Sequence, residues 1–562
     1  MAPMLRLRNV FRHEWTLVSL FALVLASVMT WPALRDPLHT MPNDYRDPSL
    51  QAWQMAWIGW IVKRDPGELW DTNAFHPEPS TLAFSDTLLG YLPFALIGHD
   101  TGAAILRYNI LFMLVFALAF AGAYFLARQL GSGIPGAAVA GAAFAYAPWH
   151  WSQISHLNIL SAGGMALSLA MLARGHGYSL RAGYRPELVR PKWAVAGWLT
   201  ATWQITLGFG IGLGFLYVLS LLFVVTLVVW LVRRRPRLGR PLLLADAIGA
   251  VILLTVSVLL SRPYFAVQER YPEAARTLHE IELFGPDWKG FFVAPRPSWL
   301  WGGAHASLRD SYQGRGGSEV LVFAGYTLYA LAVAGLVLSV WSIGRRIALA
   351  TGITLTVLAA LGVHSWTRGA YLFLYDHLPG WDANRTPGRW VVWTTLLLGL
   401  LAAGAVTALW ERAATWRWPR VTAVALFLPA VLVLAEGLQE AKFPVVPPAP
   451  AALRTAEGPI LVLPSTRSVD EVYQLWLADS FQPLVNGYSG LIPNSLARTR
   501  KETASFPDQA SVAYLRKLGV KTVVVLRQPP GAAAHKRAFT AGIDGLGLTR
   551  TERPDAVVFK LS

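Results

Sequence analysis

Long apolar segments recur along the whole chain and are separated by short or strongly polar connections. Eleven of these segments approach the roughly 20 residues that a helix needs to cross a bilayer core of about 30 Å. We therefore expect a mainly α, polytopic membrane protein of about eleven transmembrane helices. A glycine-rich turn around Gly208 would separate two segments that nearly abut. The expected spans are 15–34, 106–128, 135–149, 159–174, 193–207, 209–232, 242–260, 320–341, 347–363, 390–410 and 421–435.

The composition supports this interpretation and excludes several classes of protein. Hydrophobic residues make up 54% of the 562 residues and charged residues only 15%, whereas a soluble domain carries about 25% charged residues. A soluble enzyme and a disordered chain are therefore unlike this composition. The chain has no cysteine, which excludes disulfides, Cys-ligated zinc, iron–sulfur clusters and thiol catalysis.

The formal net charge of +16 has two interpretations, nucleic-acid binding and membrane orientation. Threading the chain through the expected spans collects basic residues on one side, which is the positive-inside pattern of a multi-pass protein in the cytoplasmic membrane. We therefore expect a cytoplasmic N-terminus, an outer C-terminus and no nucleic-acid partner. These basic residues are Arg6, Arg8, Arg12, Arg174, Arg181, Arg185, Arg190, Lys192, Arg233, Arg234, Arg235, Arg237, Arg240, Arg345, Arg346, Arg412, Arg417 and Arg420.

The organisation predicted from these patterns is a transmembrane region followed by a small outer domain. Residues 1–440 form the transmembrane region, and a Pro-rich linker covers 441–458. Residues 459–562 alternate strand and helix patterns and predict an extracytoplasmic α/β domain. The outer loops 35–105, 262–319 and 364–389 are the longest connections. In the tail we expect strands at 459–464, 520–526 and 556–561, and helices at 469–478 and 510–518.

The first outer loop offers the clearest candidate for chemistry. Asp47 precedes a helical pattern and is expected to cap that helix, with Asp44 just before it. Trp53 and Trp57 fall on one face, which is typical of a helix lying at the membrane interface. A carboxylate there can act as a base towards an acceptor hydroxyl, or hold a metal bound to phosphate. The alternative is that Asp47 only caps the helix and Asp44 is a solvated loop residue.

Further candidates lie in the outer segments. Arg385 and Arg389 share one short loop before a span, and Arg262 ends another span on the outer side. A guanidinium offers a planar fork of donors suited to phosphate, although arginines near span ends also simply reach for the interface. His156 lies in a polar turn that either lines a cavity or is only wet. The candidate substrate contacts are completed by Gln51, His76, Trp53 and Trp57, of which the two tryptophans would guide a lipid tail.

Several pieces of sequence, in this order, resemble the bacterial polytopic GT-C-type glycosyltransferases and their uncharacterised relatives. They are Asp47-Pro48 followed by Trp53 and Trp57; the stretch 75–86; Tyr108-Asn109; Ser155-His156-Leu157; 385–389; Val462-Leu-Pro464; and 485–490.

The resemblance implies a GT-C fold and an inverting transfer of sugar from a polyprenyl phosphate, on the outer face of the membrane, to an envelope glycan, lipid or protein. It gives the role of catalytic base or metal ligand to Asp47, with Asp44 as its neighbour, and allows a divalent cation such as Mg or Mn. Tyr45 and Arg46 separate the two acids, whereas many such enzymes carry them side by side. A lipid-linked sugar flippase and a non-catalytic envelope scaffold remain as alternatives.

Overall fold

The computed structural model describes residues 13–98, 100–232, 238–312, 316–413, 421 and 424–562. Several of the basic residues used above to predict orientation lie outside these residues, namely Arg6, Arg8, Arg12, Arg233, Arg234, Arg235, Arg237, Arg417 and Arg420. By its internal contacts the chain divides into two compact units. The first unit comprises 1–31, 111–259 and 275–441, and the second comprises 32–110, 260–274 and 442–562.

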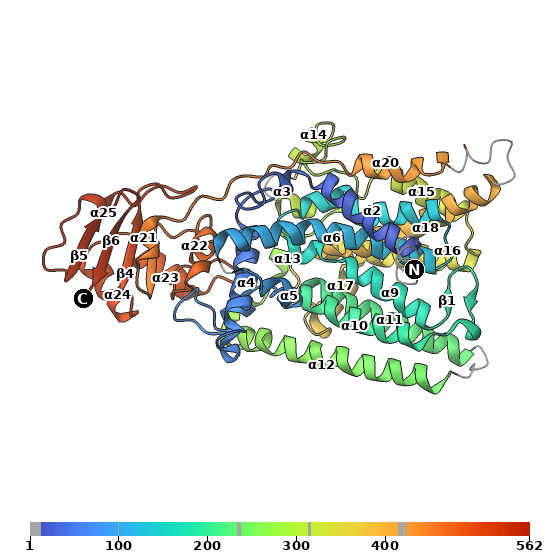
Figure 1. Cartoon of the computed structure of the whole chain (residues 1–562), viewed down its shortest axis with the longest axis horizontal. Coiled ribbons are helices and arrows are strands. Elements are labelled where there is room, and N and C mark those ends of the chain that lie inside the picture. Colours follow the sequence, from blue (N-terminus) through green and yellow to red (C-terminus); the bar gives the residue numbers. More distant parts are fainter. Residues whose placement is uncertain (1–12, 99, 233–237, 313–315, 414–420, 422–423) are drawn as a thin grey trace, which may run out of the picture. The chain divides into compact units, whose positions relative to one another are not determined.

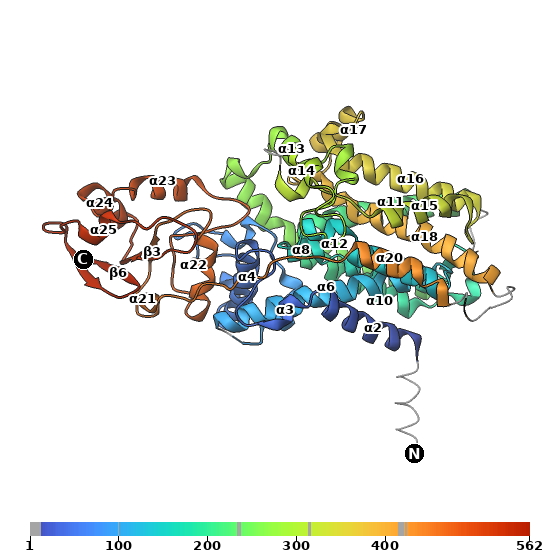
Figure 2. The same cartoon turned by 90° about the horizontal axis from the view of Figure 1, so that it is seen from above.

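The first unit is built from helices, with one short β-hairpin (Figures 1 and 2). Within it α18 packs against α7, α15 and α16, and α10 packs against α9. Its helices are α2 (Glu14–Met29), α7 (Ile134–Tyr146), α8 (Leu157–Leu160), α9 (Gly163–Gly175), α10 (Pro191–Leu207), α11 (Phe209–Val232), α13 (Leu278–Phe284), α14 (Ala306–Asp310), α15 (Tyr326–Val337), α16 (Ile343–Leu361), α17 (Arg368–His377), α18 (Val391–Ala413) and α20 (Leu428–Glu436). The hairpin pairs β1 (Tyr178–Ser179) with β2 (Gly183–Tyr184). Helices α6 (Thr101–Gln129) and α12 (Arg240–Arg270) each contribute residues to both units.

Six helical segments in the described part of the chain are long and apolar enough to cross a membrane. They overlap six of the eleven expected spans, and each of the other five spans overlaps a shorter helix. The protein is thus mainly α and polytopic, as the sequence predicts, whereas the count of eleven spans is not confirmed. The six segments are Thr101–Gln129, Leu157–Gly175, Phe209–Val232, Arg240–Arg270, Ile343–His364 and Pro387–Ala413.

The second unit contains a four-stranded sheet in the order β3-β4-β6-β5 (Figure 1). β3 (Ile460–Leu463) runs parallel to β4 (Thr522–Leu526), and β6 (Ala556–Leu561) pairs antiparallel with both β4 and β5 (Leu548–Glu552). Strands β3, β4 and β6 match the sequence prediction. β5 was not predicted, because Leu548 is its one apolar residue and the strand therefore gives no apolar run.

Helices cover both faces of this sheet. Side chains of α22 (Asp470–Trp476) pack with Val462 and Val524 on one face, and those of α24 (Gln509–Lys517) pack with Val523 and Val525 on the other. The parallel β3–β4 pair needs a crossover between its strands, and that crossover carries α22, α23 (Asn494–Glu502) and α24. The unit also contains α3 (Pro32–Arg35), α4 (Asp47–Ile61), α5 (Leu92–Ala95), α21 (Ala451–Arg454) and α25 (Arg537–Thr540).

Candidate functional site

Asp47 is the first residue of α4, and Arg46 occupies the cap position before it. The expectation that Asp47 caps the helix is therefore wrong by one residue. Pro48 suits the first turn because it has no N–H to leave unpaired, and an acidic residue there is favoured by the helix dipole. The carboxylate of Asp47 accepts a hydrogen bond from the hydroxyl of Tyr488, with Oη 3.1 Å from Oδ1.

Asp44 lies in the turn before the helix and organises that turn. Its Oδ1 accepts a hydrogen bond from the backbone N–H of Arg46 at 3.0 Å, and its Oδ2 accepts one from the side chain of Asn43 at 2.9 Å. Asn43 has a left-handed backbone with φ 67°, which asparagine tolerates better than most residues. The charges of Asp44 and Asp47 both act on the buried Tyr108 of α6. The two acids of the sequence prediction thus share one neighbourhood.

Helix α4 is buried on nearly every side, which corrects the expectation of a helix lying at the membrane interface. Trp53 is 2% exposed and Trp57 4% exposed. Their indole N–H groups donate to Asn73 at 3.1 Å and to the carbonyl of Leu69 at 2.9 Å. The tryptophans were expected at the interface because their helical spacing alone does not distinguish a lipid-facing stripe from a buried one. Gln51 is buried on the same helix.

The loop after α4 pairs with a segment of the tail. The backbone N–H of Phe75 donates to the carbonyl of Asn486 at 3.1 Å, and that of His76 donates to Leu484 at 2.9 Å. A Cβ on Gly487 would lie 2.4 Å from the ring of Phe75, so only glycine fits there. Burial lowers the pKa of the half-buried His76 imidazole. Two pieces of the family resemblance are therefore physically joined.

A carboxyl group that belongs to the tail of the chain lies near the carboxylate of Asp47. Glu471, on α22, is 0% exposed, and its Oε1 lies 3.6 Å from Nε of Arg46. Helices α22 and α4 pack together (Figures 1 and 2). Burial raises the pKa of Glu471 to about 8, against the lowering effect of Arg46. Tyr488 connects the same groups, since its backbone N–H donates to Gln474 at 2.9 Å and its hydroxyl to Asp47.

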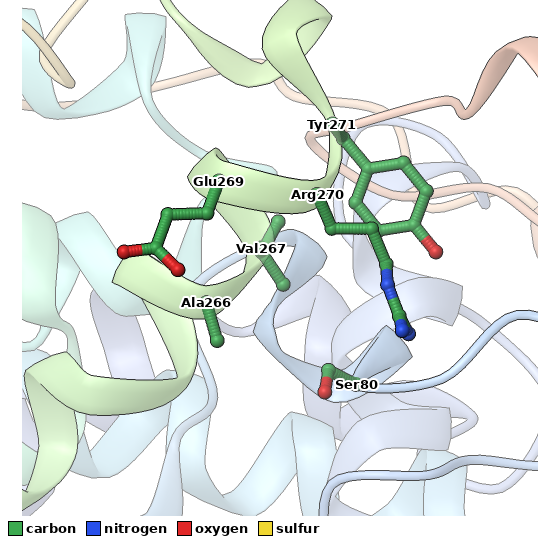
Figure 3. A pocket seen from close by; sticks show the side chains of 6 residues that line it. All are labelled: Ser80, Ala266, Val267, Glu269, Arg270 and Tyr271. Atoms are coloured by element: carbon green, nitrogen blue, oxygen red, sulfur yellow. The ribbon is translucent and has the colours of Figure 1, made fainter.

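Arg262 lies within α12, which continues past Pro263 to Arg270. The helix thus continues beyond the residue at which the span is expected to end, and the Arg262 side chain is exposed. The end of α12 borders a cavity of about 460 Å³ (Figure 3). None of the predicted site residues lines this cavity. Its lining residues are Ser80, Ala266, Val267, Glu269, Arg270 and Tyr271.

In the first unit, the carboxylate of Glu319 joins two of the predicted phosphate contacts. Nη2 of Arg389 donates to Oε1 of Glu319 at 3.1 Å, and Nε2 of His156 lies 4.0 Å from the same oxygen. Burial alone would raise the pKa of Glu319, but the charges of Arg389, His156 and Arg385 outweigh it and hold that pKa below its ordinary value. Nε of Arg389 is buried and has no hydrogen-bond partner among the described residues.

Arg385 lies in the same charged group and stacks its guanidinium over Phe284 at 4.6 Å from the ring centre. A third arginine, Arg276, lies close to both: burial and the charges of Arg385 and Arg389 lower its pKa. Its Nη1 lies 3.7 Å from Oε1 of Glu280. Three guanidinium groups and His156 thus lie near two carboxylates, Glu319 and Glu280.

The described residues contain no group of three or more His, Cys, Asp or Glu side chains arranged to hold a metal ion. Asp44 and Asp47 supply carboxylate oxygens of the kind that Mg and Mn prefer. Asp44 and Asp47 are therefore the candidate ligands of the predicted divalent cation, and dependence on a metal stays a prediction.

The residues of these two groups that were not predicted from the sequence include Glu471, Tyr488, Glu319, Glu280 and Arg276. Glu471 and Tyr488 lie more than 400 residues from Asp47 in the chain, so no local pattern links them to it. Glu319 and Arg276 belong to the loop 262–319, expected on the outer side, where neither residue stands in a motif. The segment 485–490 was noted for its resemblance, and its tyrosine was the one available signal.

No protein-family model matches the chain, and no curated protein matches it by sequence. Among solved structures, the arabinofuranosyltransferase AftD from Mycobacteria matches with a TM-score of 0.51 and 15% identity. The match covers 98% of this chain, which spans only about 40% of the length of AftD.

Two further structures match less closely. ArnT from Cupriavidus metallidurans, solved with undecaprenyl phosphate, has a TM-score of 0.46, 18% identity and 97% coverage of both chains. The Archaeoglobus fulgidus oligosaccharyltransferase has a TM-score of 0.48 and 13% identity, over 92% of this chain and 70% of that one. Likenesses below 0.5 are too loose to argue from.

The likeness to AftD establishes the architecture. The chain is a multi-pass membrane protein with the fold of the GT-C glycosyltransferases, as the resemblance in the sequence predicts. At 15% identity the likeness extends to the fold alone.

Proposed function

We propose that this protein is an integral-membrane glycosyltransferase that moves one sugar from a polyprenyl-phosphate carrier to an extracytoplasmic glycan, lipid or protein acceptor. The observation that carries the proposal is the placement of Asp47. An acid at the start of α4 receives a hydrogen bond from Tyr488 and lies beside a second, buried carboxyl group. The GT-C fold supports the same class of reaction.

In this proposal Asp47 is the catalytic base. The acceptor hydroxyl loses its proton to Asp47 as its oxygen attacks the anomeric carbon, and the bond between that carbon and the phosphate oxygen breaks. The phosphate leaves with the electron pair, and the configuration at the anomeric carbon inverts. Tyr488 holds the carboxylate in one orientation, which keeps its other oxygen in a fixed direction.

In this proposal the phosphate contacts are Arg385 and Arg389, with His156 and Arg276 beside them. Developing negative charge is stabilised most by donors already held in place, and Arg389 is held by Glu319 while Arg385 is held over Phe284. The buried Nε of Arg389, which has no partner among the described residues, is a donor that a phosphate oxygen satisfies. His156 and Arg276 add charge to the same group.

Orientation and cation requirement belong to the proposal as well. The N-terminus is cytoplasmic, and the α/β part acts outside the cytoplasmic membrane. Asp44 and Asp47 are the candidate ligands of a divalent cation such as Mg or Mn. Activity that is lost in EDTA and restored by either ion supports that role, and activity unchanged by EDTA refutes it.

The test is transfer by the purified protein in nanodiscs, supplied with radiolabelled polyprenyl-phosphate sugars and envelope extracts as acceptor. D47N should lose transfer by about 10²–10⁴-fold, which is the usual contribution of a general base. The control is D65N, which changes an exposed aspartate of the same outer loop and should transfer normally.

Three other outcomes would contradict this proposal. Full transfer by D47N refutes Asp47 as the base. Movement of the labelled lipid across the bilayer without transfer identifies a flippase, and neither activity in a folded protein identifies a scaffold.

A further inference from the structure

Two neighbouring acids on α22 have opposite surroundings. Asp470 and Glu471 are both 0% exposed. Asp470 is fully engaged: Arg500 donates to it at 2.9 Å, Ser465 at 2.7 Å and Asn486 at 3.0 Å. Neither carboxyl oxygen of Glu471 has a hydrogen-bond partner among the described residues. Asp470 therefore links α22 to three other residues of the tail by hydrogen bonds, whereas Glu471 makes no such link in the described part of the chain.

An unsatisfied buried carboxyl group is costly, and natural proteins keep such groups at functional sites. A hydrophobic side chain in place of Glu471 would pack without that cost. What Glu471 does face is the start of α4: Arg46 lies 3.6 Å away, and the charge of Asp47 acts on it. The carboxyl group of Glu471 thus faces α4, and among the described residues it makes no hydrogen bond that would stabilise its own domain.

Arg46 and Tyr488 are the physical link between the two acids. Arg46 precedes Asp47 in the chain, occupies the cap position of α4 and carries the guanidinium next to Glu471. Tyr488 donates to Asp47, and the charges of both Asp47 and Glu471 act on it. A change at Glu471 therefore reaches Asp47 by two routes, through the turn at Arg46 and through the tyrosine hydroxyl.

We propose that Glu471 is a positioning residue for Asp47, acting through Arg46 and Tyr488, so that the C-terminal α/β part completes the catalytic centre. In this proposal the carboxyl group of Glu471 limits where the Arg46 side chain lies, and Arg46 is the residue from which α4 presents Asp47. The inference rests on the proposed function, in which Asp47 is the base. It assigns to the tail a part in catalysis in place of an accessory role.

The test compares E471Q, R46Q and the double variant with E457Q, which makes the same change at an exposed glutamate of the tail. E471Q and R46Q should each lower kcat for transfer about tenfold or more. The double variant should be no worse than the worse single variant, because both changes break one link. Binding of undecaprenyl phosphate should stay within about twofold, and E471D should regain part of the lost kcat.

A second readout does not depend on activity. The same four variants, together with D47N and the D47N/E471Q double variant, are unfolded thermally, and coupling between positions 47 and 471 appears as non-additive shifts in Tm. Unchanged kcat in folded E471Q, or additive effects in both measurements, overturns the positioning role. Failure of the proposed function is recognised separately, because it appears as no transfer by the unaltered protein or full transfer by D47N.

Discussion

Replacing Glu471 by glutamine should change the pH dependence of stability in a definite direction. Burial raises the pKa of this carboxyl group to about 8, from an ordinary value of 4.5. The folded protein therefore binds a proton between these pH values that the unfolded chain has already lost. Linkage then requires that the free energy of unfolding falls as pH rises from about 4.5 to about 8.

The size of the effect follows from the same numbers. Each pKa unit corresponds to about 1.4 kcal/mol, so the difference between 4.5 and 8 amounts to roughly 5 kcal/mol above pH 8. The amide of the glutamine is itself buried without a partner, which costs about 1–3 kcal/mol. We therefore expect E471Q to be more stable than the unaltered protein by about 2–4 kcal/mol at pH 9, and no more stable at pH 5.

The comparison requires that the charged and titratable residues interacting with Glu471 are left unsubstituted. They are Arg46, Asp47, Asp470, Tyr473 and Tyr488. The assay is thermal unfolding of the protein in nanodiscs, followed by tryptophan fluorescence from pH 5 to pH 9, with E457Q as the control. Parallel curves for E471Q and the unaltered protein would refute the reasoning, because they mean that Glu471 is ionised alike in both states.

Two further changes test the remaining contacts. Y488F removes the hydroxyl that donates to Asp47 and should lower kcat about threefold to tenfold. It should lower Tm by no more than a few degrees, since one hydrogen bond usually contributes about 0.5–1.5 kcal/mol. A kcat equal to that of the unaltered protein contradicts a role of this contact in transfer. R389Q leaves the buried carboxylate of Glu319 without its arginine and should cost about 3 kcal/mol at pH 7. Since the folded pKa of Glu319 is lowered, that difference should shrink as pH falls below about 4.5, and an equal Tm at pH 7 contradicts the ion pair.

The fold was largely predictable because its determinants are local. Apolar length and helical pattern marked the spans, and apolar runs marked β3, β4 and β6. Helix α4 was also predicted, but its surroundings were not. A stripe at positions 53 and 57 has the same spacing whether the stripe meets lipid or protein, and the partners that bury it, such as Asn73, come from another segment.

The candidate site was predictable only in the residues that local motifs single out. Asp47 and Asp44 follow from the Asp-Pro motif, and Arg385 and Arg389 from two arginines in one short outer loop. Their partners were not predictable, because a carboxyl group that pairs with an arginine shows no pattern until the fold brings the two together. Glu319 is the clearest case, since only the structure shows that it holds Arg389.

The buried acids Glu319 and Glu471 have pKa values shifted in opposite directions because their neighbours differ. Each is desolvated, which favours the protonated form. Glu319 is surrounded by Arg389, Arg385 and His156, whose charges overcome that cost and keep its pKa low. Among the described residues, the cation near Glu471 is Arg46, whose Nε lies 3.6 Å from Oε1, and burial raises the pKa of Glu471. Glu319 is thus a fixed charge that orients a cation, whereas Glu471 is a carboxyl group whose charge depends on pH near neutrality. The proton transfer proposed at Asp47 is sensitive to a neighbour of the second kind, and the proposed phosphate contact of Arg389 is served by a neighbour of the first.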